Sequence, residues 1–221
     1  MLRAVTPGRT RSKWPLRIIA ALAAIVGLGV LFVRSARDTR AKPYAVDRQA
    51  LRGWTVTIES GASPNAPALL LLAPSGLSGD VFHQIFTRAM ESLGAPAFDG
   101  IPLLLQAELE GAFAGRADPE TLVAAAASAG LTPGPLEPRC LAYRRVSTPS
   151  GTRQLYFVLF DAAPFARFRE QIAALGDATK FTPAALSPAL MIAGSDASYA
   201  SWLPIRADPA TDCVAPIEIR P

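Results

Sequence analysis

The sequence predicts an α+β protein: one N-terminal transmembrane helix followed by a single globular domain with a mixed β-sheet and helices. Three observations carry this prediction. An uncharged apolar run lies near the N-terminus, and after it short apolar runs typical of strands alternate with amphipathic segments typical of helices. The length of 221 residues, half of them apolar, suits one domain of ordinary size beside the N-terminal segment.

The apolar run covers residues 18–33, between Arg17 and Arg34. As a helix it spans ~24 Å, against a hydrocarbon core of roughly 30 Å. Trp14 and outward-reaching arginine side chains extend this short span. We expect an uncleaved signal anchor. A cleaved signal peptide and a buried core helix are the alternatives, disfavoured because charged residues follow the run and no amphipathic pattern marks it.

Charge is distributed unevenly along the chain. Residues 1–42 hold nine Lys/Arg and one Asp, a net charge of +8, whereas the remainder holds 13 basic and 17 acidic residues, a net charge of −4. The basic residues therefore flank the apolar run, where they favour contact with membrane lipid, and they do not indicate a nucleic-acid partner. We predict an inner-membrane protein with residues 1–17 as a basic cytoplasmic tail and the C-terminal domain periplasmic or extracellular.

The globular domain is expected at residues 54–221, after a juxtamembrane linker at residues 34–53. Trp54–Ile58 and Ala68–Ala73 are predicted strands, the second one central. The clearest helix runs from Asp80 to Leu93, with Ser78 as its cap. Its apolar stripe consists of Val81, Phe82, Ile85, Phe86, Ala89, Met90 and Leu93.

Two more helices complete the first half. One is predicted at residues 102–113, and the next has Asp118 as its cap, Pro119 at its first position and Gly130 as its stop. A proline-rich linker at residues 131–138 follows.

The second half begins with an antiparallel hairpin. Its elements are predicted as strands Cys140–Ser147 and Gln154–Asp161, helix Pro164–Leu175, strand Pro188–Gly194, a short helix capped by Ser195 or Asp196, and a last strand from Cys213. Because hairpins and helical crossovers alternate, we expect one mixed sheet.

Cys140 and Cys213 are the only two cysteines. Their separation fits neither a C-x-x-C redox pair nor a clustered zinc site. We expect a disulfide that ties the last strand to the middle of the domain. Two buried free thiols, or a reactive cysteine, remain as alternatives.

The loop from Ser75 to His83 is the most suggestive place for chemistry, because a strand ends there and a helix opens. It lacks the phosphate-loop and dinucleotide patterns, and it differs from a nucleophile elbow by one position. Ser78 and His83 are therefore weak catalytic candidates. His83 is the sole histidine, so a Ser/His/Asp triad would need two residues of one helix, and we expect His83 on the surface beside Thr87.

No cofactor and no metal site are expected. Zinc sites built from several histidines are excluded by the single His83. Three pairs of acidic residues are expected to be solvated or to cap helices, with a glycosidase or calcium role as the alternative. These pairs are Glu108/Glu110, Asp118/Glu120 and Asp208/Asp212.

Phe181 to Gly194 is similar to the second motif of the two-histidine phosphoesterases only in its proline and the strand that follows. Ala189, Leu190 and Met191 stand where that family has His-x-Thr, so the sequence does not assign the chain to the family. A shared fold would imply an inert relative, because that chemistry needs two imidazoles.

Two functions stay open. The first is a single-pass membrane protein whose extracytoplasmic domain binds an envelope protein or small ligand without catalysis. The alternative is a membrane-anchored hydrolase with a site near the Ser75 to His83 loop.

Overall fold

The computed structural model describes residues 22–31, 34, 39, 41–89, 91–149, 151–195 and 199–221, in two units that divide after Thr39. In the first unit, residues 22–31 are helical. Among the described residues, no helix is long and apolar enough to cross a membrane. The predicted basic tail, both ends of the predicted span, Met90 and Asp196 lie outside the described residues.

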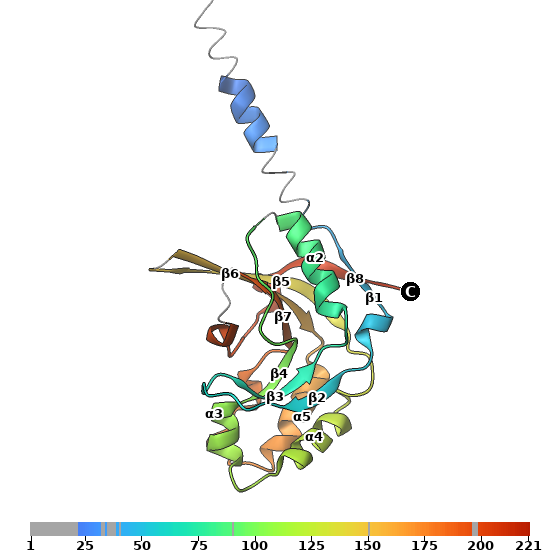
Figure 1. Cartoon of the computed structure of the whole chain (residues 1–221), viewed down its shortest axis with the longest axis vertical. Coiled ribbons are helices and arrows are strands. Elements are labelled where there is room, and N and C mark those ends of the chain that lie inside the picture. The colour runs from blue at the N-terminus through green and yellow to red at the C-terminus, as the bar shows by residue number, and fades with distance from the viewer. Residues whose placement is uncertain are drawn as a thin grey trace, which may run out of the picture. The chain divides into compact units, whose positions relative to one another are not determined.

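Short apolar runs and alternating segments form eight strands among the described residues (Figure 1). They are β1 (Tyr44–Asp47), β2 (Thr55–Ile58), β3 (Pro67–Leu72), β4 (Gly100–Leu105), β5 (Pro138–Thr148), β6 (Gly151–Phe160), β7 (Ala189–Gly194) and β8 (Cys213–Arg220). The α-helices are α2 (Leu77–Ala89), α3 (Gln106–Glu108), α4 (Pro119–Ser128), α5 (Ala163–Ala173) and α6 (Pro209–Asp212). Short 3₁₀ and π turns lie at Gln49–Leu51, Leu109–Phe113, Pro183–Ala185 and Tyr199–Trp202.

The strands form two sheets. The larger has the order β1-β8-β5-β6-β7, with β1 parallel to β8 and the other pairs antiparallel. The smaller is antiparallel, in the order β2-β3-β4. The α+β class, the mixed sheet, the β5-β6 hairpin and the central position of β3 are therefore confirmed, although the strands divide between two sheets.

Strand β6 shows how the larger sheet is buried on both faces. Because successive side chains of a strand point to opposite faces, Tyr156, Val158 and Phe160 join one apolar cluster and Leu155, Phe157 and Leu159 the other. The first cluster also contains side chains of α2, α4, α5 and the smaller sheet. The second cluster also contains Cys140 and Ala142 of β5, and Leu203 and Ile205 cover it.

Helix α2 begins three residues earlier than predicted. Gly76 has φ +93°, a conformation that glycine adopts without strain, and the helix starts directly after it. Ser78 therefore lies inside the first turn and is not a preceding cap. The predicted stripe was too wide: Val81, Ile85 and Ala89 are buried, but Phe86 is 51% exposed. Phe86 lies about 140° around the helix from Val81, beyond the reach of the sheet that buries the other side.

The helix predicted at residues 102–113 is wrong in its first four residues, whereas residues 106–113 are helical. Residues Gly100–Leu105 form β4, buried along its whole length, and the helical segment that follows, Gln106–Glu108 with the π-helix Leu109–Phe113, is shorter than predicted. A continuous apolar run does not by itself distinguish a buried strand from a helix. Pro102 is compatible with β4 because this strand lies at an edge of its sheet.

The predicted linker at residues 34–53 is wrong in its second half. Tyr44–Asp47 forms β1, which pairs in parallel with β8, and Leu51 is buried. The outer edge of β1 is covered by Gln84 of α2: its Oε1 accepts from the Ala45 N–H at 2.9 Å and its Nε2 donates to the Ala45 carbonyl at 2.8 Å. Tertiary pairing with the distant C-terminal strand holds this short segment, so local periodicity does not reveal it.

Candidate functional site

An apolar cleft of about 210 Å³ lies beside α2. It is formed where the first two turns of the helix face the loop before β4 and the side of β7. Its lining consists of Ser78, Gly79, Phe82, Ala95, Pro96, Asp99 and Ile192. The loop is fixed by Gly94 and Gly194, which exchange two backbone hydrogen bonds of 2.8 and 3.0 Å.

Two polar side chains of this cleft, Ser78 and Asp99, are hydrogen-bonded to each other. Ser78 Oγ donates a hydrogen bond to Asp99 Oδ1. Asp99 is itself held in place by its carbonyl, which accepts from the Ala73 N–H at 3.0 Å. The cleft can therefore hold one inserted apolar group, with a hydroxyl and a carboxylate at its edge.

A second hollow of about 320 Å³ shares Asp99 with the cleft. It lies along the same loop, between residues 97–99 and the start of the smaller sheet. Its further lining comes from Glu59, Ser60, Gly61, Ala66, Pro67, Leu70 and Leu72. The loop at residues 94–99 is thus bordered by concave surface on both sides.

His83 lies on the other flank of α2 from Ser78. Five residues of helix turn the side chain through about 140°, so Ser78 faces the apolar cleft while His83 lines an open polar groove. This groove, about 630 Å³, is bordered by Ala45, Asp47, Asp80, His83, Gln84, Arg220 and Pro221. Within the part of the chain that the structure describes, no hydrogen bond joins Ser78 to His83. As expected, His83 is exposed and its carbonyl accepts from the Thr87 hydroxyl.

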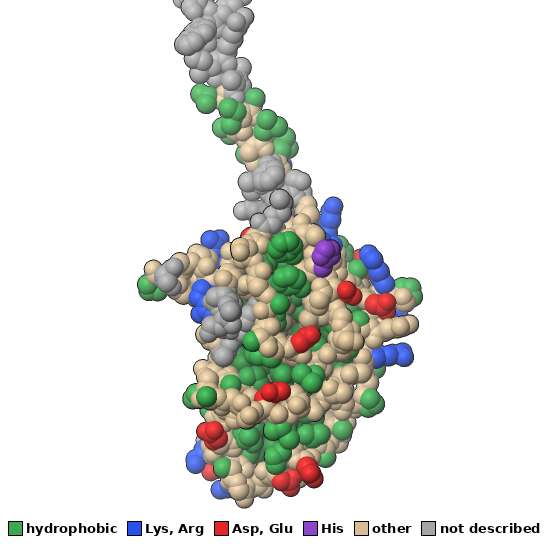
Figure 2. Space-filling model, viewed as in Figure 1, with side chains coloured by type: hydrophobic (Ala, Val, Ile, Leu, Met, Phe, Trp, Pro, Cys, Tyr) green, Lys and Arg blue, Asp and Glu red, His purple; other side chains and the backbone are tan. Residues whose placement is uncertain are grey.

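Two aromatic rings border the cleft on the helix surface. Phe82 is half-buried in the cleft wall, and Phe86 stacks on it with ring centroids 6.2 Å apart and an interplanar angle of 15°. Figure 2 shows hydrophobic side chains gathered on this face over the upper part of the folded unit, with the histidine beside them. An exposed aromatic ring stacked on the wall of an apolar cleft is typical of a binding surface.

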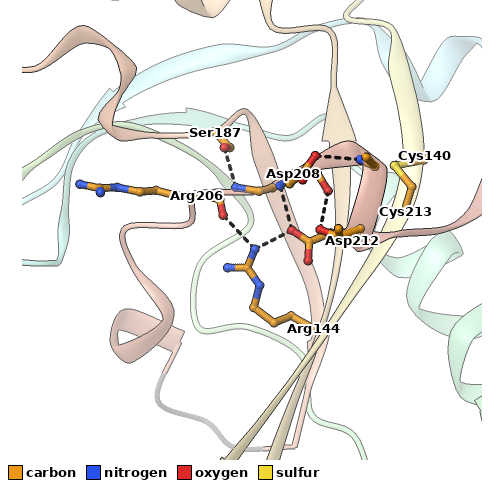
Figure 3. A network of polar contacts seen from close by, with 10 residues as sticks. Cys140, Arg144, Ser187, Arg206, Asp208, Asp212 and Cys213 are labelled. Carbon is orange, nitrogen blue, oxygen red and sulfur yellow. Dashed lines mark hydrogen bonds and ion pairs between the residues drawn. A yellow bond between two sulfur atoms is a disulfide. The ribbon is translucent and has the colours of Figure 1, made fainter.

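The predicted disulfide is confirmed: Cys140 and Cys213 are bonded. Figure 3 shows the polar network next to it. Arg144 of β5 donates to Asp212 Oδ2 at 2.6 Å and to the Arg206 carbonyl at 2.9 Å, and Asp212 also accepts from the Asp208 N–H. The start of β8 is therefore tied to β5 by both a covalent bond and an ion pair.

At least one member of each acidic pair has a structural partner. Asp118 caps α4 by accepting from the Thr121 N–H at 2.7 Å, and Asp208 caps α6 by accepting from the Ala210 N–H at 2.9 Å. Glu108 pairs with Arg169 of α5. The Thr121 hydrogen bonds hold the pKa of Asp118 below its ordinary value, and those of Thr179 do the same for the pKa of Asp177. Among the described residues, no cluster of three potential metal ligands is present.

Comparisons with protein-family models, with curated proteins and with solved structures found no match.

The sequence singled out Ser78 but not its partners in the cleft. Asp99, Ala95 and Pro96 belong to a loop without a periodic pattern, and Ile192 is brought to the cleft by the sheet. One signal was present in the sequence. The apolar stripe of α2 is wider than one packing face requires, so one of its large residues had to lie outside the core, and that residue is Phe86.

Proposed function

We propose that the chain is a single-pass membrane protein whose folded unit binds a partner or ligand outside the cytoplasm without catalysis. One observation carries the proposal: residues 22–31 form an apolar helix whose large side chains are 56–68% exposed. The exposed residues are Leu22, Ile25, Val26, Leu28, Val30 and Leu31. A helix that is apolar on all sides needs an apolar environment, and a bilayer supplies one.

The Cys140–Cys213 disulfide supports the orientation. Disulfides persist in oxidising compartments and are rare in the cytosol, so a folded unit that carries one is suited to the far side of the membrane. The short predicted basic tail then remains in the cytoplasm.

Binding without catalysis is supported by the chemistry of the cleft. At about 210 Å³ it is smaller than the 300–1,000 Å³ typical of small-ligand sites, and its wall is mainly apolar. Such a cleft suits one anchoring group of a larger partner. Ser78 has a carboxylate beside it but no imidazole, because His83 faces the other groove.

Alkaline extraction tests the anchor, and protease treatment of separate, intact spheroplasts tests its orientation. The full chain is expected to stay with membranes at alkaline pH, and external protease is expected to digest the folded unit in spheroplasts while the cytoplasm remains sealed. Release of the chain into the alkaline supernatant would contradict the anchor. Protection of the folded unit from protease would contradict the orientation.

The alternative, an anchored hydrolase, is favoured by one observation, the hydrogen bond from Ser78 to Asp99 inside the cleft. It predicts turnover of ester, phosphoester or glycoside probes that Ser78→Ala abolishes. Thr87→Ala is the matched control because it also removes a hydroxyl from α2, but Thr87 is exposed, lies outside the cleft and bonds to carbonyls of its own helix. Turnover lost in the first variant and kept in the second would replace the binding proposal.

A further inference from the structure

The place where the chain joins the folded unit is fixed against the last turn of α2. Arg88 Nη1 donates to the Lys42 carbonyl at 2.8 Å and Nη2 donates to the Pro43 carbonyl at 3.0 Å. The guanidinium also lies over the ring of the buried Tyr44, 4.1 Å from its centroid. The segment that leads out of β1 toward the N-terminus is therefore held beside Arg88.

Little chain lies between this place and the apolar run. Eight residues, 34–41, separate Val33 from Lys42. Fully extended they reach about 29 Å, and as a helix about 12 Å. With residues 18–33 embedded as proposed above, Lys42 and the last turn of α2 beside it must stay within about 29 Å of the bilayer, the reach of the extended segment.

Near this place, the end of α2 carries an exposed aromatic ring on one side and a basic side chain on the other. Phe86 lies two positions before Arg88, exposed and stacked on Phe82. Within α2 the acidic residue, Asp80, lies in the first turn and the basic residue, Arg88, in the last turn, and Glu91 follows the end of the helix. Aromatic and basic side chains together are typical of surfaces that lie in the interface of a membrane.

The charge of the connecting segment fits the same partner. Residues 34–42 hold four basic residues and one acidic residue, Asp38. A basic stretch next to a membrane span attracts anionic phospholipid head groups. Exposed apolar rings, basic charge and a short connection therefore all point toward one occupant.

We propose that the face of α2 that carries Phe82 and Phe86 docks on the anionic phospholipid bilayer that holds the N-terminal helix, with Phe86 inserted at the boundary between head groups and acyl chains. This inference rests on the membrane anchor proposed above and names the partner of the apolar cleft. The cleft beside Phe82 then receives an apolar part of a lipid.

The test places a fluorescent probe on α2. Phe86→Cys in the full chain is labelled with a bimane maleimide, without reduction so that the Cys140–Cys213 disulfide stays closed. The protein is reconstituted in phosphatidylglycerol and phosphatidylcholine vesicles that contain a phospholipid with a nitroxide quencher near its head group. Thr87→Cys serves as a second probe that keeps the Phe86 ring, and Ala127→Cys, exposed on α4 at the other end of the folded unit, is the matched control (Figure 1).

Both α2 probes are expected to be quenched about two-fold or more beyond the Ala127→Cys probe, since an interfacial helix lies roughly 5–10 Å deep in the head-group boundary. Sedimentation of the same vesicles after alkaline treatment reports the anchor separately. Protein that sediments with vesicles while its α2 probes are quenched no more than the control would overturn the docking and leave the anchor intact.

Two other results would also reject the docking. A chain that fails to sediment would reject the anchor and the docking together. Emission from the α2 probes that shifts to the blue as protein density rises, without dependence on the quencher lipid, would show a second copy of the chain on this face in place of lipid.

Discussion

Arg169 of α5 binds Glu108 through both nitrogens at the end of its guanidinium; the Arg169 side chain is 4% exposed and the Glu108 side chain 14%. The remaining N–H groups donate to the backbone: Nε to the Pro183 carbonyl, Nη1 to Leu103 and Nη2 to Thr182. Glu108 also accepts from the Leu105 N–H. One buried cation thus joins α5, the end of β4 and the segment before β7.

Replacement of Arg169 by Met is expected to lower the free energy of unfolding by about 3 kcal/mol, because it leaves the largely buried Glu108 carboxylate and three backbone carbonyl groups without their donor. Urea unfolding measures the loss. Arg116→Ala is the matched control: Arg116 pairs with Asp177 at 3.8 Å on the surface, and its loss is expected to change stability by about 0.5 kcal/mol or less. Equal effects of the two variants would contradict this account.

Two glycines near the start of α2 are expected to respond to alanine with opposite signs. At Gly76, φ is +93°, so Ala is strained there and is expected to destabilise the fold by about 1–2 kcal/mol. Gly79 lies within the helix and has free space around an added Cβ, so Ala is expected to stabilise by about 0.5 kcal/mol. Thermal unfolding of both variants compares them directly, and a shift of equal sign would be incompatible with the helix start at Leu77.

Removal of the disulfide by Cys140→Ala with Cys213→Ala is expected to lower the free energy of unfolding by about 4 kcal/mol, given a sequence separation of 73 residues in the chain-entropy model. Urea unfolding of the variant and of the oxidised protein gives the difference. The reduced wild-type chain is the control and is expected to match the variant. Unchanged stability after complete reduction would show that the polar network beside the bond holds β8 without it.

The capping of α4 by Asp118 is expected to depend on pH. Its pKa is lowered in the folded chain by Thr121, so the carboxylate stabilises the fold above its unfolded pKa near 3.8, and this stabilisation is lost as the pH falls through the folded pKa. The difference in unfolding free energy between wild type and Asp118→Ala is therefore expected to be full above about pH 5 and to shrink in more acidic solution.

Thr121→Val is the matched control for this dependence. It removes the hydroxyl donor to Asp118 Oδ2 but keeps the backbone N–H donor to Oδ1, so its acid dependence is expected to be weaker but of the same sign. A difference between wild type and Asp118→Ala that stays constant down to strongly acidic pH would refute the role of the ionised cap.

Local signals predicted much of this fold. Asp118 before Pro119 located α4, and the alternating strands around a turn located the β5-β6 hairpin, because caps and turns act over a few residues. The sequence did not reveal β1, whose partner β8 lies at the far end of the chain, or β4, whose apolar run suits either a strand or a helix. The candidate site was predicted only at Ser78, since Asp99 and Ile192 reach it through tertiary packing.

The side-chain amide of Gln84 has a consequence for assembly. An edge strand with free backbone groups is a template on which another chain can add a strand. At Ala45 the backbone N–H and carbonyl both already bond to the side-chain amide of Gln84, in the way that they would bond to a neighbouring strand. Growth of the sheet at this edge by strand addition between molecules is thereby blocked, which protects against fibrous aggregation where chains are concentrated.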